Sequence, residues 1–354
     1  MRILITGGAG FVGSSLAFAF KRESPSHAIV AFDNLKRRGA ETNLQLFKHR
    51  GIDFVHGDVR NPTDLDDLIG EFDLLVEASA EPSVHAGISG SPHYVLETNL
   101  MGTLRCLEFA RRRAENFIFL STSRVYSIEP LKQMKLIETQ NRFELSGEQT
   151  IPGVSTHGIS ETFPTHLPRS LYGASKLASE LIIQEYVSTY GLRAIINRCG
   201  VLAGPGQFGK VDQGVFTLWV ANHYFKRALR YTGFGGSGKQ VRDLLHPLDL
   251  YSLIKKQLPV MDRHAGEVFN VGGGTACSTS LLELTTVCRQ VTGNQVQVEP
   301  VPESTTVDIP LYISDFRKVS KSFNWLPECS VSAIVIDIAN WIKANEDQVK
   351  FLFT

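Results

Sequence analysis

Residues 3–13 read Ile3-Leu4-Ile5-Thr6-Gly7-Gly8-Ala9-Gly10-Phe11-Val12-Gly13, and this stretch decides the fold. A short apolar run passes into three glycines spaced Gly-x-x-Gly-x-x-Gly, and an apolar helical pattern follows. This order predicts a strand, a tight turn and a helix whose N-terminus faces a diphosphate. Gly7 allows the turn, Gly10 lets the backbone approach the phosphates, and Gly13 lets helix and strand pack closely. Phe11 and Val12 then open the helix and belong to the same phosphate-binding stretch.

Length and charge limit the classes of function. The chain has 354 residues, with 36 Lys and Arg, 36 Asp and Glu, and a pI near 7.1. This length is enough for a large core divided between two domains. A balanced charge with only short basic runs favours neither nucleic acid nor an anionic membrane as a partner.

The cysteine and hydropathy patterns indicate a reducing compartment. The 5 Cys residues are scattered and form no Cys-x-x-Cys, which argues against a disulfide framework or a metal site. No apolar run reaches the roughly 18 residues that a membrane span needs, and no secretory signal precedes the first strand. We therefore expect a cytoplasmic protein without a metal or a membrane partner.

Strand-like and helix-like patterns alternate through the first half of the sequence. Strands are expected at 2–6, 28–32, 53–57, 73–78, 116–121 and 193–197. Helices are expected at 12–22, 62–70, 93–114 and 172–190, and again at 214–228, 280–292 and 331–345. This alternation predicts an α/β fold with a Rossmann-type, doubly wound parallel sheet. Ligands of such sheets lie outside the carboxyl ends of the strands.

The regular alternation breaks after about residue 198, which suggests two domains. We expect residues 1–198 to form the dinucleotide-binding domain, with part of 241–270 returning to it. Residues 199–240 and 271–354 then form a smaller α/β domain for the substrate. The segment 127–170 is a long insertion between core elements, a kind of segment that often carries function.

Residues at the predicted strand ends outline a cofactor site. Asp33 ends the second strand twenty positions after Gly13, where an acid accepts hydrogen bonds from an adenosine ribose. Its charge would repel a 2′-phosphate, so NAD is favoured over NADP, although the adjacent Lys36–Arg38 could soften this preference. Asp58 could bind the adenine amino group or serve only as a turn residue. The full set of expected contacts at these strand ends is Asp33, Asn34, Asp58, Val59, Ala78 and Ala80.

Two later motifs predict proton transfer. Residues 117–126 form an apolar strand that ends in hydroxyls, including Thr122. Tyr172-Gly173-Ala174-Ser175-Lys176 then opens a helix, in which positions i and i+4 share one face. Tyr172 and Lys176 should therefore face one cleft, where an ammonium and a cationic nicotinamide lower the phenol pKa. With Thr122 binding the reacting oxygen, this set suits removal of an alcohol proton as hydride leaves its carbon.

With these motifs in order, the chain resembles the extended short-chain dehydrogenase/reductases, the superfamily of nucleotide-sugar epimerases and dehydratases. The resemblance places Thr122, Tyr172 and Lys176 on the catalytic positions. It also makes Lys176 a ligand of the nicotinamide ribose and puts Asn99 in the cofactor site. Dehydratases of this superfamily carry Thr-Asp-Glu where this chain has Thr122-Ser123-Arg124. The missing acids favour an epimerase, which needs only hydride transfer out and back.

Further motifs resemble the CDP-paratose (tyvelose) 2-epimerase subgroup. They are residues 32–40, Asp212-Gln213-Gly214, and Gly238-Lys239-Gln240-Val241-Arg242-Asp243-Leu244-Leu245-His246. The resemblance makes Arg242 the ligand of the substrate diphosphate, and an Arg fork suits phosphate geometry. Pro302 and Pro310 stand where the family has arginines, so either Arg242 and Lys239 carry diphosphate recognition or the substrate is unusual. The expected substrate contacts are Thr122, Arg124, Gln213, Lys239 and Arg242.

The sequence therefore predicts an NAD-dependent epimerase of a nucleotide-diphosphate sugar that acts through a transient ketone, with C2 of a CDP-hexose as the candidate position. Two alternatives stay open. One is a net sugar-nucleotide oxidoreductase or sulfosugar synthase-type enzyme of the same superfamily, and the other is a non-catalytic NAD-sensing protein. The predicted helices 93–114 and 172–190 could pair across a homodimer, as the resemblance implies.

Overall fold

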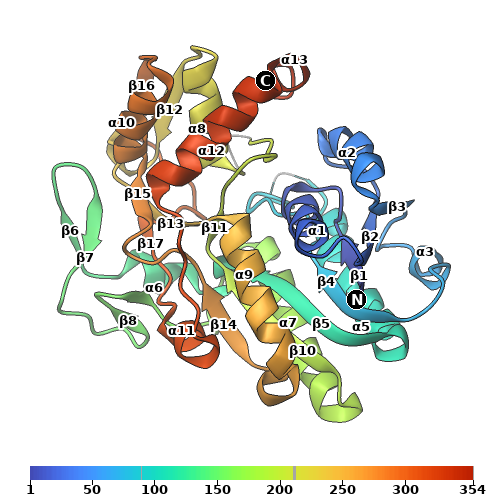
Figure 1. Ribbon diagram of the computed structural model, residues 1–354. Helices are drawn as coiled ribbons and strands as arrows, with labels where there is room; N and C mark the ends of the chain where they lie inside the picture. The colour runs from blue at the N-terminus through green and yellow to red at the C-terminus, as the bar shows by residue number, and fades with distance from the viewer. Residues whose placement is uncertain (89, 210–212, 354) are drawn as a thin grey trace.

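The computed structural model describes residues 1–88, 90–209 and 213–353. Its centre is a seven-stranded parallel sheet in the order β14-β10-β5-β4-β1-β2-β3 (Figure 1). The strands are β1 Arg2–Thr6, β2 Ala28–Asp33, β3 Asp53–His56, β4 Phe72–Glu77, β5 Ala114–Thr122, β10 Arg193–Cys199 and β14 Val268–Val271. The predicted α/β fold with a doubly wound parallel sheet is confirmed.

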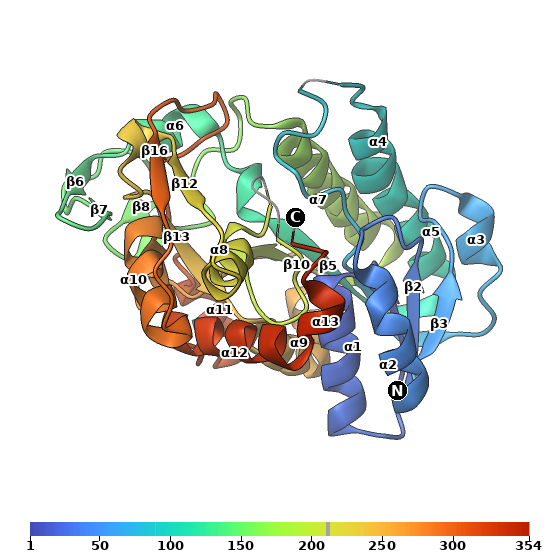
Figure 2. The same cartoon turned by 90° about the horizontal axis from the view of Figure 1, so that it is seen from above.

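Helices cover both faces of the large sheet, which explains why its strands are apolar along most of their length. One face packs against α1 Phe11–Glu23, α9 Pro247–Gln257 and α11 Arg317–Phe323. The other face packs against α5 Gly102–Arg113 and α7 Leu171–Tyr190. Figure 2 shows α1 and α9 on one side of the sheet and α5 and α7 on the other.

Several predicted helices end early or are interrupted. The stretch expected as one helix over 93–114 consists of α4 His93–Leu96, a π-helical turn at Glu97–Met101, and α5. The helix expected at 62–70 is only α3 Pro62–Asp66, and the one expected at 214–228 is α8 Val215–Tyr224. A π turn inside a helix is often found at functional sites. Other short helices are η1 Ala40–Thr42, α2 Asn43–Arg50, η4 Phe234–Gly236 and η5 Leu258–His264.

The C-terminal part of the chain builds a smaller domain beside the large sheet. Its strands β11 Val201–Leu202, β13 Val241–Leu245, β15 Ser278–Ser280 and β17 Leu311–Tyr312 form one sheet, and β12 Leu229–Thr232 pairs with β16 Val298–Val301. The helices α8, α10 Leu281–Thr292 and α12 Val331–Ala344 enclose a second apolar core, with α13 Glu346–Val349 following. Because β13 belongs to this domain while α9 and β14 join the large sheet, the chain returns to the first domain between Leu245 and Pro247.

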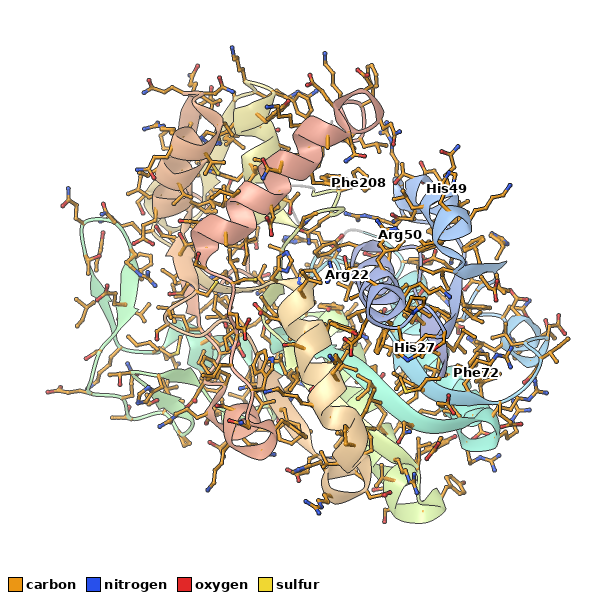
Figure 3. All side chains as sticks on the ribbon, viewed as in Figure 1. Arg22, His27, His49, Arg50, Phe72 and Phe208 are labelled. Atoms are coloured by element: carbon orange, nitrogen blue, oxygen red, sulfur yellow. The ribbon has the colours of Figure 1, made fainter. Side chains whose placement is uncertain are left out.

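The two domains also meet at the loop before α8. Phe208 of this loop lies between α2 and the C-terminal helices (Figure 3). Its ring packs against Trp341 and Phe353, at centroid distances of 5.6 and 5.7 Å. Arg37, in the loop after β2, donates to the carbonyl oxygen of Phe208 at 2.8 Å. The loop that follows Asp33 is therefore tied to the smaller domain.

The long insertion between β5 and α7 lies against the smaller domain. It contains η3 Ser123–Val125, α6 Ile128–Lys132, and the hairpins β6 Leu136–Glu138 with β7 Phe143–Leu145 and β8 Val154–Ser155 with β9 Gly158–Ile159. The N–H of Phe143 donates to the carbonyl of Lys239 at 3.0 Å, and the N–H of Asn270 donates to Glu161 at 2.7 Å. The insertion thus contacts both the segment before β13 and the end of β14.

Among the residues that the structure describes, no helix is both long and apolar enough to cross a membrane. In the same part of the chain, no group of His, Cys, Asp and Glu side chains is arranged to hold a metal ion. All 5 Cys residues are free thiols.

Candidate active site

The turn between β1 and α1 requires glycine at two positions. Gly7 has a φ of 65°, and a Cβ there would lie 2.7 Å from the carbonyl oxygen of Ala78. A Cβ on Gly13 would lie 2.2 Å from the carbonyl oxygen of Gly7. The turn therefore packs tightly against both its own helix and the end of β4, and this packing fixes where α1 begins.

The first turn of α1 presents backbone donors toward a ligand. Its N-cap is Gly10, and no side chain caps the helix or places an acid in the first turn. The amides of Phe11, Val12 and Gly13 belong to the group that an α-helix cannot pair internally. Such a helix end attracts anions through its amides and its dipole. The geometry fits the pyrophosphate of a dinucleotide.

Asp33 lies beside this turn at the end of β2. Its carboxylate accepts the N–H of Ala9 at 3.1 Å and the N–H of Leu35 at 2.8 Å. Burial raises the pKa of Asp33, although these amide donors counteract the shift. The acid therefore stands at the edge of the glycine turn, where its position in the sequence predicted it.

Asn34 and Asp58 meet at the ends of β2 and β3. Asn34 donates to the Asp58 carboxylate at 2.9 Å, and Arg60 forms an ion pair with the same group at 2.6 Å. Burial opposes the charged form, but the Arg60 guanidinium outweighs it and lowers the pKa of Asp58 to about 2. Asp58 is thus a charged acceptor at the end of β3, next to the end of β2 where Asp33 lies. Val59 instead is buried against Gly102 of α5.

Asn99 lies in the π turn and is fully buried. Its Oδ1 accepts the N–H of Glu81 at 2.8 Å, and its Nδ2 donates to the Glu81 carbonyl at 3.0 Å and to Ser175 Oγ at 3.3 Å. These partners occupy the amide group within the protein. The side chain therefore holds the loop after β4, which contains Ala80, next to the first turns of α7.

Thr122, Tyr172 and Lys176 come together at the carboxyl end of β5. Ser170 caps α7 by accepting the N–H of Gly173 at 3.2 Å, so this helix begins next to Tyr172. A Cβ on Gly173 would lie 2.0 Å from the Arg124 carbonyl, which shows that the first turn of α7 packs onto η3. The Thr122 hydroxyl, in turn, hydrogen-bonds the Tyr172 phenol.

Lys176 lies one helical turn beyond Tyr172 and is only 2% exposed. Its Nζ donates to the Leu120 carbonyl at 3.0 Å and lies 4.3 Å from the centre of the Phe119 ring. Burial lowers the pKa of this ammonium. Lys176 therefore places a charge beneath the cleft, close to the last residues of β5.

The surroundings of Tyr172 make its phenol less acidic than a free tyrosine. Burial raises the pKa of the phenol to about 12, against the effect of the Thr122 hydrogen bond. In the protein without a bound nicotinamide, desolvation of the phenol dominates, and the Lys176 ammonium is directed at the Leu120 carbonyl. Proton removal near neutral pH therefore needs further positive charge beside the phenol.

Arg124 and Arg242 are partly buried cations that act on each other. Arg124 donates to the Val307 carbonyl at 3.4 Å, and Arg242 donates to the Ile309 carbonyl at 2.8 Å. Burial, and then the neighbouring Arg124, lower the pKa of Arg242 to about 9, while Asp308 acts weakly in the opposite direction. Neither guanidinium forms an ion pair with a carboxylate of the described chain. Two neighbouring arginines, with Asp308 acting on both but in ion-pair contact with neither, suit a diphosphate.

The other expected substrate contacts lie apart from this pair. Lys239 forms an ion pair with Glu138 of β6 at 2.8 Å, so its charge is already matched. The Oε1 of Gln213 is buried without a partner in the described part of the chain, which leaves it available to a ligand. Asp212 lies outside the described residues. The electrostatic neighbour of Arg242 in the structure is Arg124, whereas Lys239 pairs with Glu138.

Pro310 stands where the resemblance expects an arginine. Its carbonyl accepts the N–H of Val241 at 2.9 Å, directly before Arg242. The second guanidinium of this region therefore comes from η3 and not from the segment around Pro302 and Pro310. Arg124 stands where the dehydratases of the superfamily have an acid. In the folded chain it acts on Arg242, which is 118 positions away in the sequence.

A buried ion pair that the sequence analysis missed supports the cleft. Glu180 lies one turn beyond Lys176 and pairs with Arg198 of β10 at 2.6 Å. Ser121, the residue before Thr122, donates to the same carboxylate at 2.5 Å. The only signal in the sequence was the four-residue spacing that continues from Tyr172 through Lys176 to Glu180.

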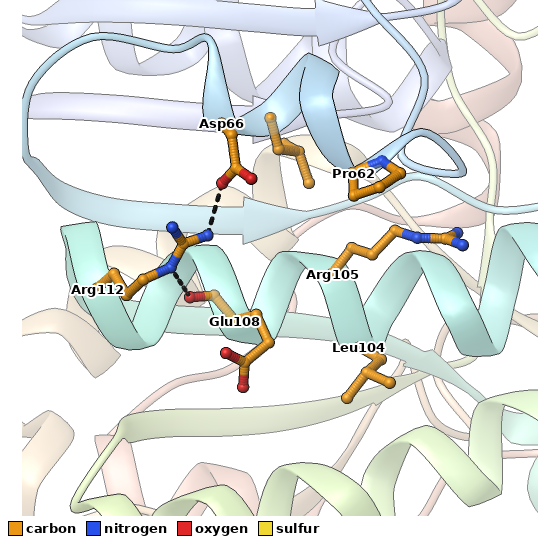
Figure 4. Close-up of a pocket in the computed structure, with 7 residues that line it drawn as sticks. Pro62, Asp66, Leu104, Arg105, Glu108 and Arg112 are labelled. Carbon is orange, nitrogen blue, oxygen red and sulfur yellow. Dashed lines mark hydrogen bonds and ion pairs between the residues drawn. The ribbon is translucent and has the colours of Figure 1, made fainter.

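A separate pocket lies between α3 and α5 (Figure 4). Arg112 pairs there with Asp66 at 2.6 Å and donates to the Glu108 carbonyl at 3.0 Å. None of the candidate cofactor or substrate residues lines this pocket, so it is not part of the site. Its lining consists of Pro62, Leu65, Asp66, Leu104, Arg105, Glu108 and Arg112.

The sheet, the glycine turn and the Tyr172–Lys176 helix define a dinucleotide-binding α/β enzyme. Residues 3–272 match the model of the family described as NAD dependent epimerase/dehydratase. The chain belongs to this family, and NAD is the cofactor that the cleft fits. Gly7 to Gly13, Asp33 and the strand ends around Asp58 and Ala78 would hold it.

Similar proteins include both an epimerase and dehydratases. The chain is 32% identical over 353 residues to CDP-paratose 2-epimerase of Salmonella typhi. The matched region covers 96% of this chain and 99% of the relative. It is 28% identical over 351 residues to dTDP-glucose 4,6-dehydratase of Streptomyces niveus, which covers 98% and 94%. A solved structure of DesIV, the dTDP-glucose 4,6-dehydratase of Streptomyces venezuelae with NAD and TYD bound, has a TM-score of 0.79 at 26% identity and covers 99% and 100%.

Proposed function

We propose that this protein is an NAD-dependent epimerase of a nucleotide-diphosphate sugar, acting through a transient keto-sugar at C2 of a CDP-hexose. The observation that carries this proposal is Arg124. Its guanidinium acts on the Tyr172 phenol from a position where the resembled dehydratases have an acid. Elimination of water needs an acid and a base beside the reacting carbon, whereas epimerisation needs only one proton-transfer group and a hydride acceptor.

The arginine pair supports a diphosphate close to the reacting carbon. Arg124 acts on both Tyr172 and Arg242, so the anion site and the proton-transfer site share one side chain. In a nucleotide sugar the β-phosphate is joined to C1, and C2 is the adjacent ring carbon. A short path from the phenol to the diphosphate therefore favours C2 over C4, which lies across the ring.

Each residue has a distinct task in the proposed reaction. Thr122 holds the reacting oxygen, and Tyr172 takes the hydroxyl proton as the C–H bond breaks. The chemistry that bound NAD supplies is acceptance of the hydride and its return to the opposite face. Lys176 provides positive charge beneath the phenol, and the arginine pair retains the diphosphate while the keto-sugar reorients. Tyr172 finally returns the proton, so the reaction consumes neither proton nor hydride.

Tyr172→Phe tests the mechanism, with Tyr190→Phe as the matched control. Tyr190 ends the same helix but is 55% exposed. Each protein is incubated with CDP-, UDP-, GDP- and dTDP-sugars in deuterated buffer, and products are followed by proton NMR. We expect Y172F to lose about 100-fold or more in turnover, because general acid–base groups contribute roughly 10²- to 10⁴-fold. Y190F should match the wild type, and wild-type turnover by Y172F would sink the proposal.

The same panel distinguishes the alternatives. Inversion without release of NADH supports the epimerase, and inversion without deuterium uptake identifies the oxidised carbon. Steady release of NADH indicates a net oxidoreductase, loss of water indicates a dehydratase, and a product formed only with sulfite indicates a sulfosugar synthase. Binding of NAD without turnover of any sugar nucleotide would indicate a sensing protein.

We also propose that the protein forms a homodimer through the outer faces of α5 and α7. These helices lie side by side on one face of the large sheet. Leu181 and Tyr190 of α7 are 58% and 55% exposed, so this face offers two large apolar side chains to a second copy. The molar mass of the protein in solution tests this assignment.

A further inference from the structure

Glu77 is a buried carboxyl that the proposed mechanism does not use. It ends β4 and has no exposed surface. Thr103 of α5 donates to its Oε1 at 2.6 Å, and its Oε2 has no hydrogen-bond partner in the described part of the chain. A buried carboxylate with an unsatisfied oxygen is costly unless an opposite charge lies near it.

That opposite charge is Lys176. In the register of β4 with β5, Glu77 is paired with Phe119, so the two side chains stand next to each other on one face of the sheet. The Lys176 Nζ lies 4.3 Å from the centre of the Phe119 ring and donates to the carbonyl of Leu120. The carboxyl and the ammonium therefore flank the same aromatic ring, in the layer between the sheet and the helices α5 and α7.

No other acid in this layer is free to neutralise Lys176. Glu180, one turn further along α7, is committed to Arg198 at 2.6 Å. Cys106 of α5 and Cys199 of β10 also act on the ammonium, but burial raises the pKa of both thiols and keeps them neutral. Phe119 and Leu120 of β5 carry no titratable group. Among the described residues, Glu77 is the remaining carboxyl.

We propose that Glu77 is a positioning residue for the cleft, the counter-ion that keeps Lys176 charged beneath Tyr172. The pairing stands on the geometry alone, and only the use of the charge in turnover rests on the proposed function. Burial raises the pKa of Glu77 to about 7 and lowers that of Lys176, and each group counteracts the shift of the other. Without the carboxylate, the ammonium would lose its proton at a lower pH.

The test titrates Lys176 directly in the full chain. Lysine is labelled with ¹³C at Cε, the Lys176 signal is assigned by its loss in K176R, and its chemical shift is followed against pH. E77Q removes the charge and keeps the shape, whereas the control T103V removes the hydrogen bond and keeps the charge. We expect Lys176 to titrate about one pH unit or more lower in E77Q and near its wild-type value in T103V.

An unchanged Lys176 titration in E77Q overturns the proposal. If E77Q does not fold, E77M carries the same test, because methionine is neutral and similar in length. Turnover separates this proposal from the proposed function, since the high-pH limb of kcat in E77Q should move down together with the Lys176 titration. A shifted titration in a protein that turns over no sugar nucleotide supports the electrostatic coupling of Glu77 to Lys176 and counts against the proposed function alone.

Discussion

At the residue scale, Arg242 is held by backbone contacts in a position that is unfavourable for its own charge. Its guanidinium is partly buried near Arg124, so desolvation and like charge both work against its charged form. Both guanidinium groups are oriented by backbone carbonyls of the segment before β17. An anionic ligand would offset both the loss of hydration and the repulsion between the two guanidinium groups, which is why this pair favours a diphosphate.

Replacing Arg242 by Met should weaken the binding of a nucleoside diphosphate about 10- to 150-fold, because a hydrogen bond to a charged group contributes about 1.5–3 kcal/mol. Arg124→Met should weaken it in the same direction. Arg230→Met is the control, since that side chain is 70% exposed on β12. Titration calorimetry with CDP and UDP measures the affinities. Equal affinity of R242M and the wild type would show that the diphosphate binds elsewhere.

At the element scale, the ion pairs at the two ends of β10 differ in burial: Arg193 pairs with Glu115 and Asp262 at its start, and Arg198 pairs with Glu180 at its carboxyl end. Arg198, at its carboxyl end, pairs with Glu180 at 2.6 Å, and these side chains are 8% and 2% exposed. Arg193, at its start, pairs with Glu115 at 2.7 Å, and these side chains are 42% and 57% exposed. Only the buried pair joins the strand to the helix that carries Tyr172.

Arg198→Met should lower the free energy of unfolding by about 3–5 kcal/mol, because it leaves the Glu180 charge buried without a partner. Arg193→Met, at the other end of the same strand, should cost less than about 1 kcal/mol. Urea unfolding followed by circular dichroism compares the two variants. Similar small losses in both would mean that water reaches Glu180 and that the buried pair does not anchor α7.

At the scale of the whole molecule, the two domains meet at the loop that follows Asp33. Arg37 and Arg38 of this loop donate to the carbonyls of Phe208 and Phe351, at 2.8 and 2.7 Å. A Cβ on Gly39 would lie 2.2 Å from the Phe208 ring. The smaller domain therefore holds in place the loop against which the adenosine end of NAD would lie.

Phe208→Ala should speed the release of NAD, because truncating a buried Phe removes about 3–5 kcal/mol of packing at this contact. Phe351→Ala is the control, since its ring is 67% exposed and the substitution keeps the carbonyl that accepts from Arg38. Release is measured as the rate at which bound NAD leaves the protein after an excess of a competing ligand for the same site is added. An unchanged rate in a destabilised F208A protein would limit this contact to a role in folding.

Much of the fold and half of the site could be read from local patterns. The glycine turn, the alternation of strands and helices, and the Tyr172–Lys176 spacing depend on residues a few positions apart, and the structure has all of them. The interruption of the helix at 97–101 could not be predicted in this way. It accompanies contacts of Asn99 with Glu81 and Ser175, which lie on other elements.

The sequence by itself determined the α/β class, the family and the cofactor turn, because each depends on backbone geometry and side-chain period within one short stretch. Only the tertiary structure decided which charges meet. It placed Arg124 beside Arg242, Glu77 beside Lys176 and Glu180 against Arg198, and it raised the pKa of Tyr172 to about 12 by burial. The physical reason is that burial and electrostatic neighbours come from packing between distant segments, which spacing along the chain does not encode.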